Sequence, residues 1–273
     1  MIRKPSHKMM TTVYLIIFLY IVGGLLLYKY QRRFILRPDK LATSYRFDFP
    51  VPFREYNLAI DDTDRLNLVW LRSDSARGIV LYFHGNTGNI LQAYPHAAPF
   101  LDNHYDVLLL DYPGYGKSTG PDAEQDLYQD ALVSYQLARS RFAADSIVVY
   151  GKSLGTAMAA YVASKAPCRD LVLECPFYDY VGLARRYVPI YPVGWMLRYR
   201  FPVFDFIRHT TAPILVFHGK RDEVIPYRFS RKLEPLLKKG DRYITFPEGH
   251  HNDLTRQPGY LEAIDSLLRP AAP

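Results

Sequence analysis

Cysteine is scarce in this chain of 273 residues, which contains only Cys168 and Cys175. Two cysteines are too few for a disulfide scaffold or for a four-cysteine zinc site. Wholesale disorder is not indicated either, because hydrophobic residues make up 49% of the chain and charged residues only 22%. The length suits one sizeable core or at most two small domains.

Motifs for nucleotide and metal chemistry are also missing. The P-loop pattern G-x-x-x-x-G-K-[ST] fails at both Gly-Lys-Ser triplets, because the first glycine is replaced by Asp111 or Ser146. Neither an H-E-x-x-H motif nor a G-x-G-x-x-G fingerprint occurs. His250, His251 and Asp253 are too crowded in sequence for a standard zinc cage. We therefore expect no metal and no other cofactor.

An excess of positive charge is lacking over most of the chain, although the net charge is +7. Residues 1–40 hold eight of the 34 basic residues and one of the 27 acidic ones, so the rest of the chain has 26 of each. A nucleic-acid-binding protein usually carries a basic patch or stripe. Since the body is neutral, we expect no nucleic-acid partner, and the excess belongs to an N-terminal arm.

The arm contains one long run without charge, Met9–Tyr28. Twenty helical residues span about 30 Å, the thickness of a bilayer core. Basic residues lie on both sides of the run, namely Arg3, Lys4, Lys8, Lys29, Arg32, Arg33 and Arg37. We predict that residues 1–40 form a single-pass membrane anchor with a basic flank that favours anionic lipids. The two flanks nearly balance, so the side of the membrane stays open.

Two other interpretations of this run compete with the anchor. A cleaved signal peptide has a shorter apolar stretch and a small-residue cleavage site, but here Lys29-Tyr30-Gln31-Arg32-Arg33 follows the run. A buried helix of a soluble core is rarely apolar on every face. The membrane anchor is the better explanation of both features.

Short apolar runs alternate with helix-like segments through residues 41–270, which we expect to form one domain. The strand-like runs are Gly78–Phe83, Asp106–Asp111, Ser146–Tyr150, Asp170–Glu174, Pro213–Phe217 and Arg242–Phe246, after a hairpin of Glu55–Ile60 and Leu66–Arg72. The helical candidates are Asn89–Leu101, Ala123–Arg141, Leu154–Lys165, Tyr227–Lys239 and Pro258–Leu268. Most strand-like runs lack polar alternation, which suits strands buried on both faces of a parallel sheet. The sequence therefore predicts an α/β fold with a mostly parallel central sheet and helices on both faces.

One segment, Tyr180–Phe206, is longer than a simple crossover between strands needs. It contains three prolines, Trp195 and many tyrosines and phenylalanines. We expect a short cap insertion at about 180–206 that covers an apolar pocket. The alternative is a long loop with a helix that fills an edge of the core.

The clearest chemical motif is Gly151-Lys152-Ser153-Leu154-Gly155, between a strand-like run and a helical one. A tight strand-to-helix turn needs small neighbours, and it exposes the serine hydroxyl at the edge of the sheet. The N-terminus of the following helix offers free N–H groups to a developing oxyanion. Ser153 is therefore the candidate nucleophile.

A serine hydroxyl needs a base, and the base needs an acid to orient it. His250 and His251 follow the last strand-like run, where a loop reaches the same edge of the sheet. Asp222 follows the run Pro213–Phe217, which gives the chain order serine, acid, histidine that α/β-hydrolases have. Glu174, at the end of an earlier run, is the rival acid.

An oxyanion hole requires a second backbone N–H beside that of Leu154. The segment His84–Asn89 follows a strand-like run, and its glycines allow a tight turn in which Asn86 can present its N–H. The alternative is a plain turn in which Asn89 is the N-cap of a helix.

With these residues the chain resembles an α/β-hydrolase of the membrane-anchored Bem46 and ABHD13/ABHD17-like group. The segments that carry the resemblance are His84–Asn89, Asp111–Ser118 and Gly219–Pro226, and it extends from about Phe34 to Leu268. In that group the histidine directly precedes an Asn-Asp pair, which selects His251 here, with His250 in a position that is usually small. The resemblance implies an α/β-hydrolase fold and serine hydrolase activity on acyl esters or thioesters.

We therefore expect a membrane-anchored serine hydrolase that needs no metal and acts on a small acyl or lipid-like substrate. Ser153 attacks, His251 carries the proton, Asp222 orients His251, and the N–H groups of Asn86 and Leu154 hold the oxyanion. Two alternatives stay open. One is a membrane-tethered binding or scaffold protein that keeps the fold without turnover, and the other is a peptidase.

Overall fold

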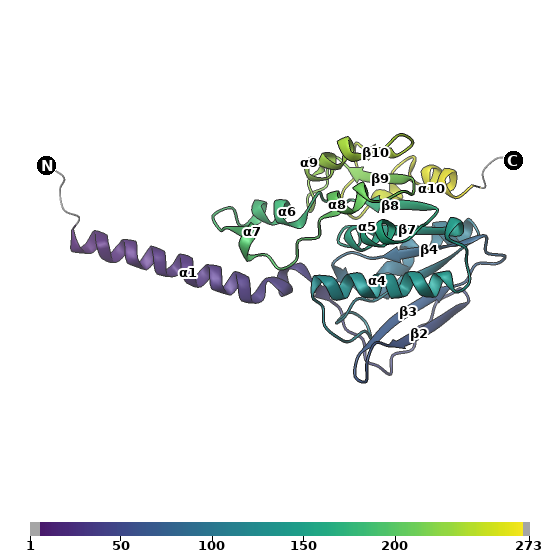
Figure 1. The fold of residues 1–273 in the computed structure, drawn as a ribbon, viewed down its shortest axis with the longest axis horizontal. Coiled ribbons are helices and arrows are strands. Elements are labelled where there is room, and N and C mark those ends of the chain that lie inside the picture. The colour runs from purple at the N-terminus through teal and green to yellow at the C-terminus, as the bar shows by residue number, and fades with distance from the viewer. Residues whose placement is uncertain (1–5, 270–273) are drawn as a thin grey trace.

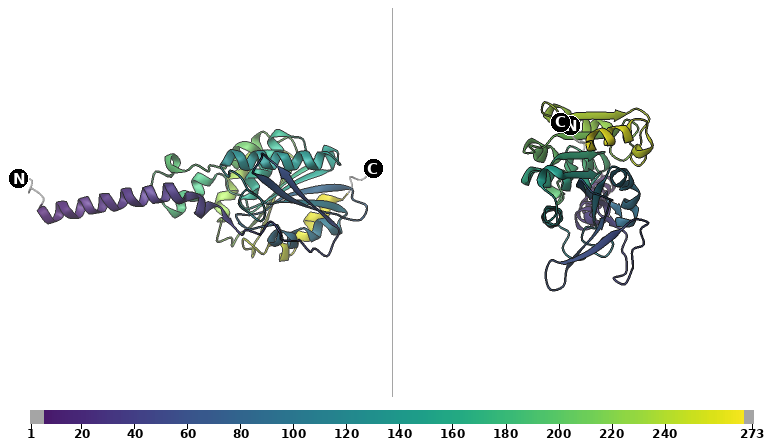
Figure 2. Two further views of the ribbon diagram at one scale, coloured as in Figure 1. Left: turned by 90° about the horizontal axis from the view of Figure 1, so that it is seen from below. Right: turned by 90° about the vertical axis from the view of Figure 1, so that its right-hand side faces the viewer.

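The computed structural model describes residues 6–269, so Arg3 and Lys4 of the basic flank lie outside the described residues. Helix α1 (His7–Ile35) extends away from the body along the longest axis of the molecule (Figures 1 and 2). Ser6 caps its first turn by accepting the N–H of Met9 at 3.3 Å. By length and composition α1 can cross a membrane.

One sheet of eight strands forms the body, in the order β10-β9-β8-β7-β4-β6-β3-β2. In chain order the strands are β2 (Phe53–Ala59), β3 (Arg65–Leu71), β4 (Gly78–Phe83), β6 (Tyr105–Leu110), β7 (Ile147–Lys152), β8 (Asp170–Glu174), β9 (Ile214–Gly219) and β10 (Arg242–Phe246). The strands from β10 to β6 are parallel, whereas β3 and β2 add in antiparallel fashion. Strands β4, β6, β7 and β9 are buried along their whole length, which explains their unbroken apolar sequences. The predicted mostly parallel α/β sheet is confirmed.

Helices cover both faces of this sheet (Figure 2). On one face lie α4 (Glu124–Arg139), α5 (Gly155–Lys165) and α8 (Val203–Arg208), whose buried residues such as Tyr128, Met158 and Ile207 share one core. On the other face lie α3 (Ala98–Asp102) and α10 (Tyr260–Leu268), where Phe100 and Ile264 belong to a second core. The sheet is thus the middle of three layers.

Two of the predicted helices are broken. The segment predicted as helix Asn89–Leu101 consists of α2 (Ile90–Ala93), a 3₁₀ turn (Tyr94–His96) and α3. The segment predicted as Tyr227–Lys239 consists of α9 (Tyr227–Ser230) and a 3₁₀ helix (Arg231–Leu236). Pro95, Pro99 and Pro235 explain the breaks, because proline lacks the N–H that continues an α-helix and its ring clashes with the preceding turn.

The segment 180–206 contains α6 (Tyr180–Tyr187), α7 (Val193–Met196) and the start of α8. Helices α6 and α7 lie between α1 and the body (Figure 1), whereas α8 packs on α5 with Val203 and Ile207 buried. After α1 the chain forms β1 (Arg37–Pro38), which pairs in parallel with β5 (Thr87–Gly88). The end of α1 is therefore joined to the segment that follows β4.

The start of α5 lies so close to β4 that only glycine fits at position 155. A Cβ atom at Gly155 would overlap the carbonyl oxygen of Phe83, which is backbone and cannot move aside. We expect Gly155→Ala to destabilise the fold by about 1–3 kcal/mol, the usual cost of overpacking, and to lower the melting temperature of the full-length chain in detergent by several degrees.

The matched control is Gly194→Ala in α7. There the nearest atom to a new Cβ is the flexible end of Arg185 at 3.2 Å, so we expect no change in melting temperature. Equal melting of Gly155→Ala and the wild type would show that the helix can retreat from the sheet without cost.

Candidate active site

Ser153 occupies the sharp turn between β7 and α5. Its backbone is in the left-handed region with φ of +53°, which is strained for a residue other than glycine. The turn is held by the N–H of Ser153, which donates to the carbonyl oxygen of Glu174 at 2.8 Å, and by the N–H of Thr156, which donates to that of Ser153 at 3.0 Å. The strain exposes the hydroxyl at the carboxyl edge of the sheet.

Three of the residues selected from the sequence lie within hydrogen-bonding distance of one another. Nε2 of His251 lies 3.0 Å from Oγ of Ser153, and Nδ1 of His251 lies 2.7 Å from Oδ2 of Asp222. With its proton on Nδ1, His251 donates a hydrogen bond to the Asp222 carboxylate, and Nε2 is left to accept a hydrogen bond from the serine hydroxyl. All three residues are buried. The arrangement can remove a proton from Ser153.

Asp222 is kept charged by its surroundings. Burial opposes its charge, but hydrogen bonds from His218 and His251 outweigh the burial and hold the pKa of this carboxyl well below its usual range. Its other oxygen accepts the backbone N–H groups of Val224 at 2.9 Å and Ile225 at 2.7 Å. These bonds fix the carboxylate, so it can orient the imidazole and stabilise it when protonated.

The loops that carry Asp222 and His251 are joined directly. The N–H of Arg221 donates to the carbonyl oxygen of Gly249 at 3.0 Å, and the N–H of Lys220 donates to that of Phe246 at 2.9 Å. Gly219 and Gly249 are glycines for a steric reason, since a Cβ on Gly219 would overlap the backbone of Gly249. Close packing of these backbones brings the acid and the base together.

His250 points away from Ser153. Its side chain is half exposed, its Nδ1 lies 3.0 Å from the carboxylate of Glu223, and its backbone N–H donates to Asp253 at 2.7 Å. Of the two adjacent histidines, only His251 contacts Ser153 and Asp222.

Glu174, the rival acid, is paired with a different residue. It lies opposite Lys152 in the β7–β8 register, and the two buried side chains form an ion pair. Burial opposes both charges, but their mutual attraction outweighs it, so that the pKa of Lys152 is raised and that of Glu174 is lowered. Nζ of Lys152 also donates to the carbonyl oxygen of His251 at 3.3 Å. Glu174 thus holds Lys152, which in turn binds the backbone of His251, whereas Asp222 contacts the imidazole ring of His251 directly.

The candidate oxyanion donors lie beside Ser153. Asn86 and Leu154 both line the same cavity as Ser153. Within residues 6–269, we find no protein acceptor for the backbone N–H of either residue. The turn of Asn86 is held by its own side chain, which donates to the carbonyl oxygen of Ile35 at 3.0 Å, and Asn89 caps α2 as the alternative interpretation suggested. Both donors are free to bind an anion.

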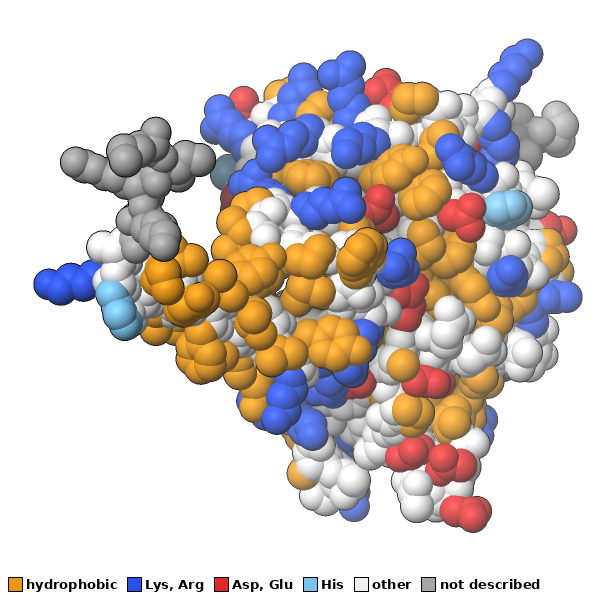
Figure 3. All heavy atoms as spheres, turned by 60° about the vertical axis from the view of Figure 1, so that its left-hand side comes forward, with side chains coloured by type: hydrophobic (Ala, Val, Ile, Leu, Met, Phe, Trp, Pro, Cys, Tyr) orange, Lys and Arg blue, Asp and Glu red, His pale blue; other side chains and the backbone are white. Residues whose placement is uncertain are grey.

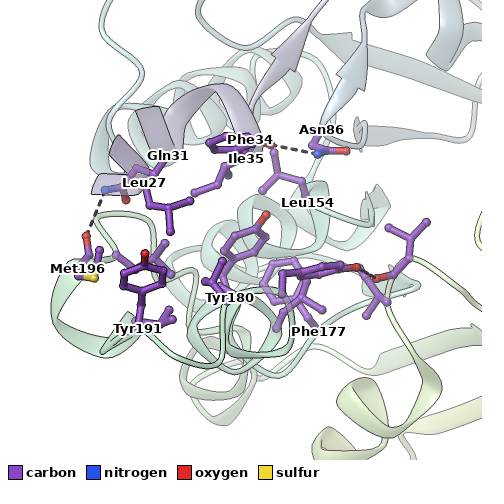
Figure 4. Close-up of a pocket in the computed structure, with 18 of the residues that line it drawn as sticks. Leu27, Gln31, Phe34, Ile35, Asn86, Leu154, Phe177, Tyr180, Tyr191 and Met196 are labelled. Carbon is purple, nitrogen blue, oxygen red and sulfur yellow. Dashed lines mark hydrogen bonds between the residues drawn. The ribbon is translucent and has the colours of Figure 1, made fainter. Parts of the chain in front are cut away.

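A cavity of about 490 Å³ leads away from Ser153. Ser153 and Leu154 line its floor. Its walls come from two places (Figure 4). One wall is the end of α1, and the other is the segment of α6 and α7, with lining residues Phe177, Tyr180, Leu183, Tyr191, Val193 and Met196. The lining is mostly apolar, which suits a hydrocarbon substrate group.

One cluster could in principle hold a metal ion. Cys175, Asp222 and His251 place one potential ligand atom each within 4.8 Å of one another. However, His251 uses Nδ1 for Asp222, and burial raises the pKa of the Cys175 thiol well above its ordinary value, so the thiolate that binds metals is disfavoured. The donor set suits the hydrogen-bonded arrangement better than a metal.

Sequence reasoning missed three contributors to the site. Lys152 was noted only as a neighbour of Ser153 in its motif, and His218 was not selected as a site residue. His218 lies buried with Nε2 3.3 Å from Asp222. Gln31 was counted with the basic flank, but it is buried and lines the cavity. Charged or polar residues at the carboxyl ends of otherwise apolar strands were the available signal for Lys152 and His218.

Comparisons with known proteins agree with this fold. A family model described as the alpha/beta hydrolase fold matches residues 78–204. The chain is 30% identical over 265 residues to protein bem46 of Schizosaccharomyces pombe, covering 89% of this chain and 87% of that protein. It is 29% identical to the uncharacterized protein YfhR of Escherichia coli, covering 66% of this chain and 65% of YfhR. It is also 29% identical to human alpha/beta hydrolase domain-containing protein 17C, covering 75% of this chain.

The chain spans slightly less than two thirds of two of these relatives, namely 65% of YfhR and 62% of human protein 17C. Among solved structures, an esterase of Pyrococcus furiosus superposes with a TM-score of 0.67 at 16% identity, covering 86% of this chain and 97% of the esterase. At this identity the superposition establishes the fold alone.

Mutation can test the contribution of the Lys152–Glu174 ion pair to stability without removing the hydrogen bonds of Asp222. Glu174→Gln leaves the charge of Lys152 buried without its partner, and we expect a loss of about 3–5 kcal/mol in stability. The double variant Lys152→Met/Glu174→Gln removes both charges and should recover most of that loss. Melting temperatures of the three full-length proteins measure the effect; a Glu174→Gln variant as stable as the wild type would refute a buried ion pair.

Proposed function

The chain belongs to the α/β-hydrolase family, and we propose that it is a membrane-anchored serine hydrolase that cleaves acyl esters or thioesters through Ser153, His251 and Asp222. The observation that carries this proposal is the hydrogen-bonded series Ser153–His251–Asp222 at the floor of an apolar cavity. A serine that is only structural has no need of an oriented imidazole or of a position in the lining of an apolar cavity.

Acylation moves one proton from Ser153 to the leaving group, with His251 as the carrier. Oγ of Ser153 attacks the acyl carbonyl carbon while its proton passes to Nε2 of His251. The charge on Asp222 stabilises the resulting imidazolium. The carbonyl oxygen becomes an oxyanion, which accepts hydrogen bonds from the N–H groups of Asn86 and Leu154. Collapse of this intermediate breaks the bond to the leaving alcohol or thiol, which takes the proton from His251.

Deacylation repeats the same steps with water. His251 accepts a proton from a water molecule that attacks the acyl-enzyme, and it returns that proton to Oγ of Ser153 when the acid departs. The apolar lining of the cavity supports an acyl group of several carbons, since each buried methylene contributes up to about 0.8 kcal/mol.

The anchor is the second part of the proposal. Helix α1 is exposed to its surroundings along most of residues 9–26, as a helix in contact with lipid would be. Lys29, Arg32, Arg33 and Arg37 follow the uncharged run and are exposed, which supports their position at a lipid headgroup layer. We propose a single-pass anchor that keeps the hydrolase domain at a membrane surface.

Ser153→Ala tests the nucleophile. Labelling by a fluorophosphonate probe requires an activated serine, so we expect this variant to lose labelling and ester turnover while its melting temperature stays near the wild-type value. Ser164→Ala is the matched control, since Ser164 lies in α5 and its hydroxyl only donates to the carbonyl oxygen of Tyr161. Wild-type labelling of Ser153→Ala would disprove the proposal, and absence of labelling in the wild-type protein would favour a binding or scaffold role.

Replacement of the two adjacent histidines tests the base. We expect His251→Ala to lower kcat by about 10⁶, the usual effect of losing the histidine of such a triad. His250→Ala should have little effect, because its ring contacts Glu223 instead. Hydrolysis of a nitrophenyl ester measures both variants. The opposite ranking would place the base one residue earlier in the chain.

A further inference from the structure

One face of the C-terminal half of α1 contacts the segment 190–198 and, at its end, the core of the body, over about four turns in all. Residues Tyr20 and Ile35 are separated by fifteen residues, which is about 22 Å along a helix. The residues of this face recur every three or four positions, and we call them the docked face: Tyr20, Gly23, Gly24, Leu27, Gln31 and Ile35. Opposite the upper part of this face lies the segment 187–196, which we call the cap tip.

The upper contacts between α1 and the cap tip are specific. The rings of Tyr20 and Tyr191 stack with centroids 4.8 Å apart and planes 13° apart. The hydroxyl of Tyr20 donates to the carbonyl oxygen of Ile190 at 2.9 Å, and that of Tyr191 donates to the carbonyl oxygen of Tyr20 at 3.2 Å. A Cβ on Gly24 would lie 3.1 Å from the ring of Tyr191, so the glycines make room for this ring.

Gln31 connects the lower part of the docked face to the end of α7. Its Nε2 donates to the carbonyl oxygen of Met196 at 3.1 Å (Figure 4), and its Oε1 accepts the backbone N–H of Arg198 at 2.7 Å. The side chain is only 8% exposed. Without Gln31, the carbonyl oxygen of Met196 and the N–H of Arg198 would lose this hydrogen-bond partner. The two hydrogen bonds therefore fix the cap against α1.

These contacts determine how deep the cap tip lies if the uncharged run spans the bilayer. Tyr20 is eight residues before the end of that run, Met9–Tyr28, which is about 12 Å along the helix. A bilayer that surrounds this run must therefore also meet Ile190 and Tyr191, which contact Tyr20.

The surface of the cap tip fits such a position. Trp195 is 91% exposed, Ile190 69% and Tyr187 60%. Figure 3 shows hydrophobic side chains that continue from α1 onto the neighbouring surface of the body, with Lys and Arg side chains beside them. The exposed arginines of the cap are Arg185, Arg186, Arg198 and Arg200, which suit anionic headgroups at the border of an apolar patch.

The cavity runs between the same two elements. Leu27, Gln31, Phe34 and Ile35 of α1 form one wall, and the cap forms the other (Figure 4). We propose that the cap tip inserts into the bilayer beside α1, and that the acyl chain of a substrate already dissolved in the membrane enters the cavity sideways between α1 and the cap. This inference rests on the proposed hydrolase function, and it makes the anchor helix a wall of the acyl-binding site.

Trp195 offers a direct test, because the chain has only two tryptophans and Trp70 is fully buried in the sheet. The full-length protein is reconstituted in phosphatidylcholine vesicles with one fifth phosphatidylglycerol, with or without brominated acyl chains. We expect brominated lipid to quench the wild type and Trp70→Phe, but not Trp195→Phe. If aqueous iodide quenches Trp195 and brominated lipid does not, the cap tip lies in water and the inference is wrong.

A second experiment concerns the substrate. Gly24→Leu keeps α1 apolar, but the new side chain must push α1 away from Tyr191. Leu25→Phe is the matched control, because Leu25 is the next residue along α1 and is 62% exposed. The measurement is kcat/KM for a long-chain ester in the vesicles relative to that for a water-soluble acetyl ester. We expect this ratio to fall at least about tenfold in Gly24→Leu, as for two lost methylene contacts, and to stay unchanged in Leu25→Phe. An unchanged ratio in Gly24→Leu would refute entry along α1.

The two proposals fail in different ways. If the wild-type protein is not labelled by a fluorophosphonate, the hydrolase function fails whatever Trp195 does. If labelling and acetyl ester turnover are present but Trp195 is unaffected by brominated lipid, only the entry route from the bilayer fails.

Discussion

The whole site depends on the parallel direction of the central strands. Because β4, β7, β9 and β10 run in parallel, the loops that follow them all begin at the same edge of the sheet. Adjacent strands are about 4.8 Å apart, and β10 lies three positions from β7, so their axes are separated by about 14 Å. His251 can reach Ser153 across that distance only if its loop folds back over the sheet. The close approach of Gly219 and Gly249 permits this, and Lys152 holds the carbonyl oxygen of His251 from below.

Much of this could be predicted from the sequence because local patterns carry it. Unbroken apolar runs between helical segments identified the parallel sheet, and Gly151–Gly155 identified the turn whose backbone now shows φ of +53° at Ser153. The helices around Pro95 and Pro235 were predicted too long, since apolar spacing alone hides a break that proline imposes. The choice of His251 over His250 came from the resemblance, and only the folded loop shows that their side chains point in opposite directions.

Contacts between distant segments could not be predicted in the same way. Lys152 and Glu174 are neighbours only because β7 and β8 pair in one register, and a shift of that register would separate them. Likewise, a helix that is apolar on nearly every face gives no indication of which side another element covers. Gly23, Gly24 and Gln31 were the only irregularities on that side of α1, and their meaning depends on Tyr191, Met196 and Arg198, which lie more than 160 residues away.

The same contacts couple the anchor to the chemistry, so the two are not independent modules. Besides the cavity wall that α1 provides, the carbonyl oxygen of Ile35 accepts the side-chain amide of Asn86, and the N–H of Arg37 donates to the backbone carbonyl of Asn86 at 2.9 Å. Asn86 also lines the cavity beside Ser153, and its N–H is the proposed oxyanion donor. Under the proposed function, a tilt of α1 in a bilayer would therefore pull on the turn that holds the proposed oxyanion donor. Since such donors act by being fixed before the reaction, we expect a chain that begins after this helix to lose both one wall of the cavity and the support of the proposed oxyanion donor.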